Sequence, residues 1–355
     1  MIYYLSAALF PLLCSAAYTN IKRKGVLLED ERDWDKFWLA LVAIMPMFLL
    51  FVLRYKYIGA DTIGYVRQFE TGMDDIKLFE IFGADYERRH ERGFSVYVKL
   101  ISLITDSYTV YFLFNGLIIF GTILGFSLKY TKNPFAFLSL FVLLGTYDFM
   151  LTGLRQSLAI IICVWSLEFV KKRKLIWFLL VVTLAYFFHK SAVIFILVYP
   201  LTHIKRLDWM LFWYSIIAII FIVGFAFFQN IFNDILGYDY TIEETGNGGI
   251  FLMLLVVLFI FSMYMHLGRD IEIEQITIPH FAIITIIFWL LRMVSRTAER
   301  ISLYFIMGFY GYFANAVLYR KGNLMSFIKY MLIFACLGLY LYRNLGVTYK
   351  FFWQG

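Results

Sequence analysis

The chain has 355 residues, of which 62% are apolar and 16% are charged, and its mean hydropathy is +0.75. This composition excludes a water-soluble globular protein, which needs more polar surface at this length. The net charge of +7 does not predict nucleic-acid binding, because Lys- and Arg-rich cytoplasmic loops produce such a charge in membrane proteins. Cys14, Cys163 and Cys336 lie in apolar runs and predict neither disulfides nor a metal site.

Long, continuous apolar runs follow one another along the chain. A helix needs about 20 residues to cross the hydrocarbon core, and uninterrupted runs favour helices over alternating strands. We predict an all-α, polytopic integral membrane protein with about eleven or twelve transmembrane helices. The predicted spans are residues 2–19, 37–53, 108–128, 134–150, 154–170, 175–188, 190–202, 209–229, 248–266, 276–294, 300–319 and 324–342.

The positions of Lys and Arg predict how the chain is oriented in the membrane. Basic clusters occur at residues 22–24, 171–174, 205–206 and 320–321. An even total of about twelve crossings places these clusters on one side, which is then cytoplasmic. Both termini and the acidic loop 230–247 lie on the other side. The total depends on the two short runs around His189, which form one kinked span, two half-helices or a re-entrant turn.

We interpret residues 1–355 as a single transmembrane domain, in which segment 54–107 is a hydrophilic insert outside the cytoplasm. Charges in this insert interleave with aromatic residues such as Phe79 and Phe94, and a disordered loop would have fewer aromatics. We therefore expect short amphipathic helices on the membrane surface, one of them over residues 93–105.

A charged group inside a span costs about 2.5–3.5 kcal/mol on insertion scales, so each one needs a reason. Arg155 lies near the start of its predicted span, where a long side chain can also snorkel to the interface. Gln156 and Ser157 follow it directly and extend the polar patch beyond what an interfacial anchor needs.

A second polar interruption is formed by His189, Lys190 and Ser191, which separate two apolar halves. Three consecutive polar residues at this position predict a water-filled cavity. Broken helices of this kind direct backbone dipoles at a bound anion.

Arg292, Arg296, Arg300 and Tyr304 recur every four residues, with Glu299 beside them. If this stretch is helical, the spacing aligns the side chains on one face. Arg binds phosphate oxygens in a bidentate manner and keeps its charge, so a row of guanidiniums suits a diphosphate. A solvated loop between helices is the alternative.

Asp61 and Thr62 open a predicted helix in the insert, where Asp61 is suited to cap the N-terminus and can also contact a substrate. His90 and Glu91 do not predict a metal site, because no second histidine stands at ligand spacing. The residues that share the non-cytoplasmic face on the predicted topology are Arg54, Asp61, Arg155, His189 and the row from Arg292 to Arg300. Their convergence predicts a functional site at that face.

The order of these residues resembles that of the EpsG/Wzy family of bacterial polysaccharide polymerases. The matching pieces are Arg54 with Gly59-x-Asp61-Thr62-x-x-Tyr65, Glu91-x-Gly93-Phe94, Arg155-Gln156-Ser157-Leu158-Ala159, His189-Lys190-Ser191 and Arg300-x-x-x-Tyr304. The resemblance covers most of the chain; each motif is weak by itself, and the full set in order is fairly specific. Ala60 departs from the pattern, because a more polar or branched residue is expected there.

The resemblance implies a glycosyltransferase with a GT-C-like membrane architecture. Such an enzyme transfers a growing glycan from undecaprenyl diphosphate to the next lipid-linked oligosaccharide repeat unit, at the outer face of the bacterial cytoplasmic membrane. It requires neither a cofactor nor a metal, because arginines can stabilise the leaving diphosphate. Membrane lipid surrounds it, and a flippase and a chain-length regulator of the same pathway are its implied partners.

Roles for individual residues follow from this chemistry. The residues expected to stabilise the diphosphate are Arg155, Arg296 and Arg300. The general base is either His189 or Asp61, unless an activated leaving group makes a base unnecessary. The residues expected to bind substrate are Arg54, Gly59, Thr62, Tyr65, Glu91, Arg92, Gln156, Lys190, Ser191, Arg292, Glu299 and Tyr304.

Other functions remain open at this point. A flippase for the same lipid-linked oligosaccharide would use a similar cationic cavity, but its charges should line a path through both halves of the membrane. A membrane acyltransferase would need a catalytic histidine deep on the side of the acyl donor. A non-catalytic assembly scaffold would not need Arg155 inside a span.

Overall fold

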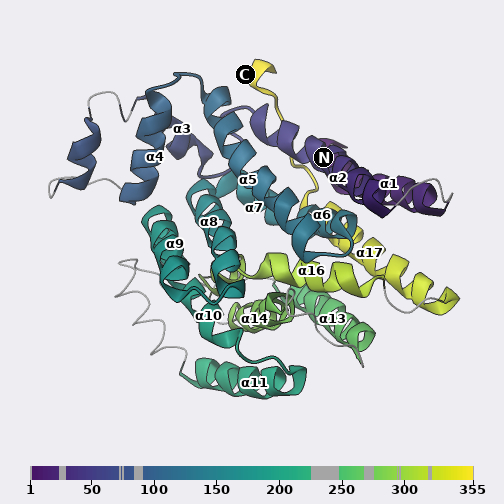
Figure 1. Cartoon of the computed structure of the whole chain (residues 1–355). Helices are drawn as coiled ribbons and strands as arrows, with labels where there is room; N and C mark the ends of the chain where they lie inside the picture. Colours follow the sequence, from purple (N-terminus) through teal and green to yellow (C-terminus); the bar gives the residue numbers. More distant parts are fainter. Residues whose placement is uncertain are drawn as a thin grey trace.

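The computed structural model describes residues 2–23, 29–71, 73, 76–83, 91–224, 248–267, 276–293, 295, 297–318 and 322–354. Within these ranges the chain forms a bundle of helices (Figure 1), with no β-strand beyond a single antiparallel bridge between Arg54 and Phe351. The predicted all-α membrane fold is therefore confirmed.

The first half of the chain contains α1 (Ile2–Arg23), α2 (Glu29–Val52), α3 (Thr62–Glu70), η1 (Leu78–Phe82), α4 (Arg92–Ser102), α5 (Tyr108–Tyr130), α6 (Pro134–Leu143), α7 (Thr146–Thr152) and α8 (Leu154–Lys171). The second half contains α9 (Leu175–Phe188), η2 (Lys190–Leu197), α10 (Val198–Leu201), α11 (Leu207–Val223), α13 (Gly249–His266), α14 (Thr277–Leu291), α15 (Thr297–Ser302), α16 (Ile306–Ala316), α17 (Asn323–Arg343) and η4 (Phe352–Gln354). The helix expected over residues 93–105 is α4.

Four helices in the described ranges are long and apolar enough to cross a membrane: Trp34–Val52 of α2, α5, α13 and α17. The pair α6 and α7, bent by 61°, adds a fifth if it is one broken span. Shorter apolar helices of 10–17 residues, such as α9 and α14, coincide with further predicted spans. The total of about eleven or twelve crossings stays a prediction.

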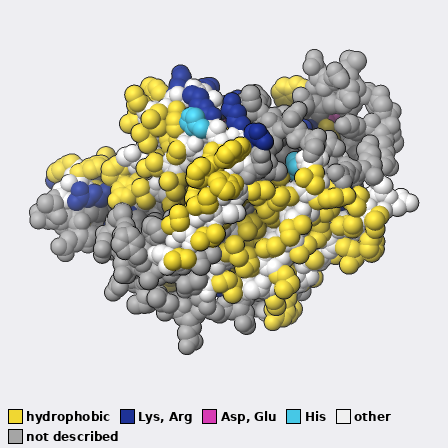
Figure 2. Space-filling view, turned by 90° about the horizontal axis from the view of Figure 1, so that it is seen from below, with side chains coloured by type: hydrophobic (Ala, Val, Ile, Leu, Met, Phe, Trp, Pro, Cys, Tyr) yellow, Lys and Arg dark blue, Asp and Glu magenta, His cyan; other side chains and the backbone are white. Residues whose placement is uncertain are grey.

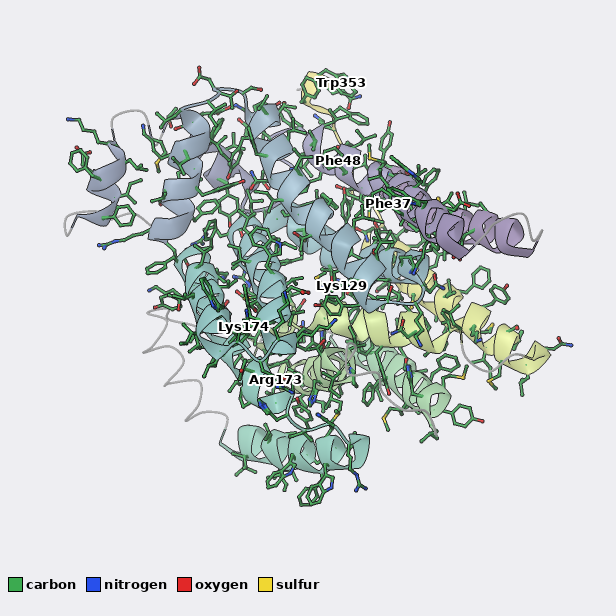
Figure 3. All side chains as sticks on the ribbon, viewed as in Figure 1. Phe37, Phe48, Lys129, Arg173, Lys174 and Trp353 are labelled. Atoms are coloured by element: carbon green, nitrogen blue, oxygen red, sulfur yellow. The ribbon has the colours of Figure 1, made fainter. Side chains whose placement is uncertain are left out.

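Loops gather at two opposite ends of the bundle. At the end that carries the insert 54–107, here called the insert end, the Tyr55 amide donates to the Lys350 carbonyl over 2.9 Å. The ring centroids of Tyr3 and Phe351 lie 5.2 Å apart at the same end. The other end carries residues 171–174 and is called the basic end. Figure 3 shows Arg173 and Lys174 far from Trp353.

This arrangement agrees with an even number of crossings, because residues near the two termini and the insert lie together. The predicted acidic loop 230–247 and the basic pair 320–321 lie outside the described residues.

The polar interruption at His189 is the tip of a helical hairpin. α9 and the segment η2–α10 pack against each other, and α9 also lies along α8 (Figure 1). The Arg173 guanidinium donates to the Thr202 carbonyl over 3.0 Å, so the chain returns to the basic end after His189. The alternative of one kinked span is therefore wrong.

Helix breaks at Gly145 and Gly153 bring the start of α8 to the insert end. Asn133 caps α6 by accepting from the Ala136 amide over 3.1 Å. Gly145 has a φ of +83°, which ends α6 in the left-handed region. Gly153 then separates α7 from α8, and a Cβ there would lie 2.6 Å from the Phe149 ring. Arg155 consequently sits in the first turn of α8, facing the insert.

Candidate functional site

Arg54, the first residue of the insert, is buried completely. Its guanidinium carbon lies 4.4 Å from the ring centroid of Phe51 and 4.2 Å from that of Phe112, so the cation is held between two aromatic faces. Its Nη1 donates to the Leu151 carbonyl over 2.6 Å. This burial favours a structural role over the predicted contact with substrate.

Gly59 and Thr62 converge on the same carbonyl. The Thr62 hydroxyl donates to the Leu151 oxygen over 2.9 Å. Gly59 has a φ of +98°, and a Cβ built there would lie 2.5 Å from that oxygen. Arg54, Gly59 and Thr62 together form what we call the Leu151 latch. The latch fixes the last turn of α7. Gly153, which separates α7 from α8, and then Arg155 follow directly in the chain.

The centre of the site is a buried carboxylate, Glu91, which receives two side chains from distant helices. Arg155 Nη1 pairs with Glu91 Oε2, and His189 Nδ1 lies 3.2 Å from Glu91 Oε1. The backbone amide of Lys190 also donates to Oε1, over 3.4 Å. Only 6% of the Glu91 side chain and 17% of the Arg155 side chain are exposed. We call these residues the Glu91 cluster.

The electrostatics of the cluster keep Glu91 ionised. Burial by itself would raise the pKa of Glu91, but the hydrogen bond with His189 and the charge of Arg155 outweigh it and lower this pKa from 4.5 to about 2. The Arg155 guanidinium also donates to the Tyr65 hydroxyl, and its central carbon lies 6.0 Å from the Tyr65 ring centroid. Glu91 and Tyr65 therefore hold the Arg155 guanidinium from two sides.

Close packing of α4 against α9 sets the position of Glu91. A Cβ at Gly93 would lie 2.7 Å from the Phe187 carbonyl oxygen, so only a glycine permits this approach. Glu91 precedes Gly93 by two residues, and His189 follows Phe187 by two. The contact thus brings carboxylate and imidazole together.

Residues of the Arg300-x-x-x-Tyr304 motif lie next to the Glu91 cluster. The Ser191 and Tyr304 hydroxyls lie 3.0 Å apart, and Gln156 donates to the Arg300 carbonyl over 2.6 Å. The charge of Arg300 acts on His189, and the Arg300 side chain is exposed.

The predicted arginine row does not lie on one continuous helix. α14 ends at Leu291, and α15 begins at Thr297. Arg292 is buried, and its Nε donates to Glu299 Oε2 over 3.1 Å. A Cβ at Gly248 would lie 2.6 Å from the Arg292 guanidinium, so this cation packs on the start of α13. Arg296 lies outside the described residues.

Two residues of the insert have different surroundings from those expected. Asp61 occupies the N-cap position of α3, but its side chain makes no capping hydrogen bond, and it is exposed. Arg92 donates to the carbonyls of Phe82 and Gly83, over 3.5 and 3.1 Å, and so fastens η1 to α4.

Sequence reasoning placed Glu91 among residues that contact substrate and missed its position between Arg155 and His189. The available signal was its motif, an acidic residue two positions before a glycine that must pack closely. In the part of the chain that the structure describes, no group of three His, Cys, Asp or Glu side chains could hold a metal ion.

Comparison with known proteins gives one match. A family model described as the EpsG family matches residues 37–354, a range that includes the Leu151 latch and the Glu91 cluster. Neither the search of curated proteins nor the search of solved structures found a match.

Proposed function

Because the chain belongs to the EpsG family, a family of polysaccharide polymerases, we propose that it is a membrane glycosyltransferase that elongates a lipid-linked glycan. The donor is the growing glycan on undecaprenyl diphosphate, and the acceptor is the next lipid-linked repeat unit. The site faces the outer side of the bacterial cytoplasmic membrane. A flippase that delivers the units and a chain-length regulator are its protein partners.

The observation that carries this proposal is the pairing of Glu91 with both Arg155 and His189. An ionised carboxylate only accepts hydrogen bonds, so the imidazole carries its proton on Nδ1. In this tautomer the basic lone pair lies on Nε2, the nitrogen that would take the proton. This arrangement favours His189 over Asp61 as the general base, because no side chain among the described residues orients Asp61 in a comparable way.

In the proposed reaction an acceptor hydroxyl attacks the anomeric carbon of the donor sugar. The hydroxyl O–H bond breaks and its proton passes to His189 Nε2, while a new C–O bond forms. The bond between the anomeric carbon and the diphosphate oxygen breaks, and its electron pair leaves with the lipid diphosphate. General base catalysis of this kind contributes about 10²–10⁴-fold.

Negative charge gathers on the leaving diphosphate, so fixed cations beside it lower the barrier. Glu91 compensates much of the Arg155 charge, and Arg155 therefore contributes mainly oriented N–H donors. Arg300 and Lys190 supply further positive charge, and Arg296 extends it. Arginines in this role make a divalent metal unnecessary in the proposed reaction.

The test is elongation by the purified protein in a membrane. We would supply lipid-linked repeat units without nucleotide sugar and with a metal chelator, and resolve the products on a gel. We expect a ladder from the wild-type protein. Arg300→Ala should lose about 10²–10³-fold in rate, as for one oxyanion donor, and His189→Ala about 10²–10⁴-fold.

The matched control is Lys350→Ala, which removes an exposed cation at the insert end and should leave the ladder unchanged. Movement of the units between leaflets without elongation would contradict a polymerase and indicate a flippase. Long polymer from Arg300→Ala would contradict the role of that residue in diphosphate stabilisation.

A further inference from the structure

Exposed cations crowd the basic end, far from the Glu91 cluster. Two loops contribute them: residues 171–174 after α8, and residues 203–206 after α10. Lys171, Lys172, Arg173, Lys174, His203, Lys205 and Arg206 all have exposed side chains. Figure 2 shows Lys and Arg side chains gathered around a His, next to a broad apolar face.

Arg173 joins these loops into one surface. It is a non-glycine residue with a φ of +54°, a conformation that needs support from its surroundings. Its guanidinium donates to the Thr202 carbonyl over 3.0 Å and lies 3.2 Å from His203 Nδ1. Glu168, one turn before Lys171, is paired with Lys129, so its negative charge is compensated. The joined loops form what we call the basic patch.

An apolar stripe begins directly beside the basic patch. Ile176, Leu180, Leu184 and Phe187 are spaced for one face of α9, and 48–73% of each is exposed. At 1.5 Å per residue the stripe is about 16 Å long. Cations at the head of an exposed apolar stripe match the shape of an anionic phospholipid, with its phosphate beside the cations and an acyl chain along the helix.

The length of α9 brings headgroups close to the patch. Its 14 residues measure about 21 Å, against about 30 Å for a hydrocarbon core. A short helix is accommodated by local thinning of the bilayer and by long cationic side chains that snorkel. Both responses place lipid phosphates within reach of Lys172, Lys174 and Lys205.

We propose that the basic patch is a binding site for the headgroups of anionic phospholipids. Lysine ammonium groups donate to the phosphate oxygens, and one acyl chain lies along the α9 stripe. The lysines of the site lie outside the Glu91 cluster, so their substitution tests lipid binding separately from the proposed polymerase reaction.

The test measures lipid binding to the purified full chain by native mass spectrometry. Phosphatidylglycerol is compared with phosphatidylcholine of the same acyl chains, and inorganic phosphate is added as a competitor. The variant carries Lys172→Gln, Lys174→Gln and Lys205→Gln. Each lysine near a charged surface is worth about fivefold in affinity, so the triple variant should bind phosphatidylglycerol about a hundredfold more weakly.

The matched control removes three exposed cations at the insert end: Arg67→Gln, Lys77→Gln and Lys350→Gln. It should keep the preference of the wild-type protein for phosphatidylglycerol, and inorganic phosphate at the lipid concentration should not displace the lipid. Equal losses in the two triple variants would overturn the proposal. Full retention of the preference in the patch variant would also overturn it and leave an acidic protein as the partner to test.

Discussion

A carboxylate buried between an arginine and a histidine acts on both of them. In Glu91, one oxygen pairs with Arg155 and the other faces His189 Nδ1. The carboxylate thus fixes the tautomer of the imidazole and the direction of the guanidinium with a single side chain. Glu91 is a positioning residue in the proposed reaction, since it acts through its neighbours.

Replacing Glu91 with Gln keeps the shape of this side chain and removes its charge. We expect elongation to slow by about 10²-fold, toward the lower limit for losing an oriented base. The acid limb of the pH–rate profile should move to lower pH, because the imidazolium of His189 loses its anionic partner. Glu91→Asp, which keeps the charge, should retain more activity. An unchanged profile in Glu91→Gln would contradict the positioning role.

The lowered pKa of Glu91 also predicts how stability depends on pH. A carboxylate whose pKa falls from 4.5 unfolded to about 2 folded stabilises the fold fully above pH 4.5, and this contribution is lost as pH falls toward 2. The loss is on the order of 3 kcal/mol. In detergent, the melting temperature of the wild-type protein should drop more steeply over this range than that of Glu91→Gln. Parallel curves would contradict the assignment.

At the level of elements, the Leu151 latch connects the insert with the break between α7 and α8. Arg54 and Thr62 both donate to one carbonyl, and Gly59 makes room for it. A carbonyl at the end of a helix lacks an intrahelical partner. Arg54 and Thr62 therefore supply the hydrogen-bond donors that α7 lacks at Leu151. The insert therefore sets the direction in which α8 starts.

Two glycines of the same segment provide a matched test of the latch. Gly59→Ala would place a Cβ 2.5 Å from the Leu151 oxygen at a positive φ, and it should destabilise the protein by about 1–3 kcal/mol. Gly64 lies in α3, where an added Cβ would meet nothing within 4 Å, so Gly64→Ala should be neutral or stabilise by up to about 1 kcal/mol. Thermal unfolding measures both. Similar melting temperatures would show that the latch is dispensable.

The sequence predicted the kind of elements better than their contacts. Apolar runs of membrane-spanning length indicate helices whatever surrounds them. The four-residue spacing of Arg292 and Arg300 suggested one helix, yet the chain breaks after α14, where Arg292 is held by Glu299 and Gly248. The spacing of residues indicates which of them share a helix face. It does not indicate where contacts with other parts of the fold end the helix.

Arg54 illustrates a similar limit. Its place in a family motif suggested contact with an anionic substrate. Burial between Phe51 and Phe112 depends on how α2 packs against α5, which no local pattern contains. By contrast, the grouping of Arg155 and His189 followed from topology, because both were predicted at the same end of the bundle, and the structure places Glu91 between them.

For the whole molecule, the two ends of the bundle make a topological prediction. Single cysteines replacing Tyr57 and Trp353, both more than half exposed, should react with a membrane-impermeant maleimide from the same side of intact cells. A cysteine replacing Lys172 should react only after the membrane is opened. The native cysteines are buried and should contribute little background. Labelling of residues 57 and 353 from different sides would contradict the structure.

The bridge between Arg54 and Phe351 also bears on how the protein is assembled. The Phe352 amide donates to the Leu53 carbonyl over 2.9 Å, and the Tyr349 hydroxyl donates to the Leu50 carbonyl over 2.6 Å. Residues 349–352 therefore complete the surroundings of Arg54. During synthesis these contacts can form only after residue 349 has been made, more than 290 residues after Arg54. The Leu151 latch needs only Arg54, Gly59, Thr62 and Leu151, so it can form before these contacts do. The surroundings of Arg54 can therefore be completed in two stages, with the contact to Leu151 before the contacts from residues 349–352.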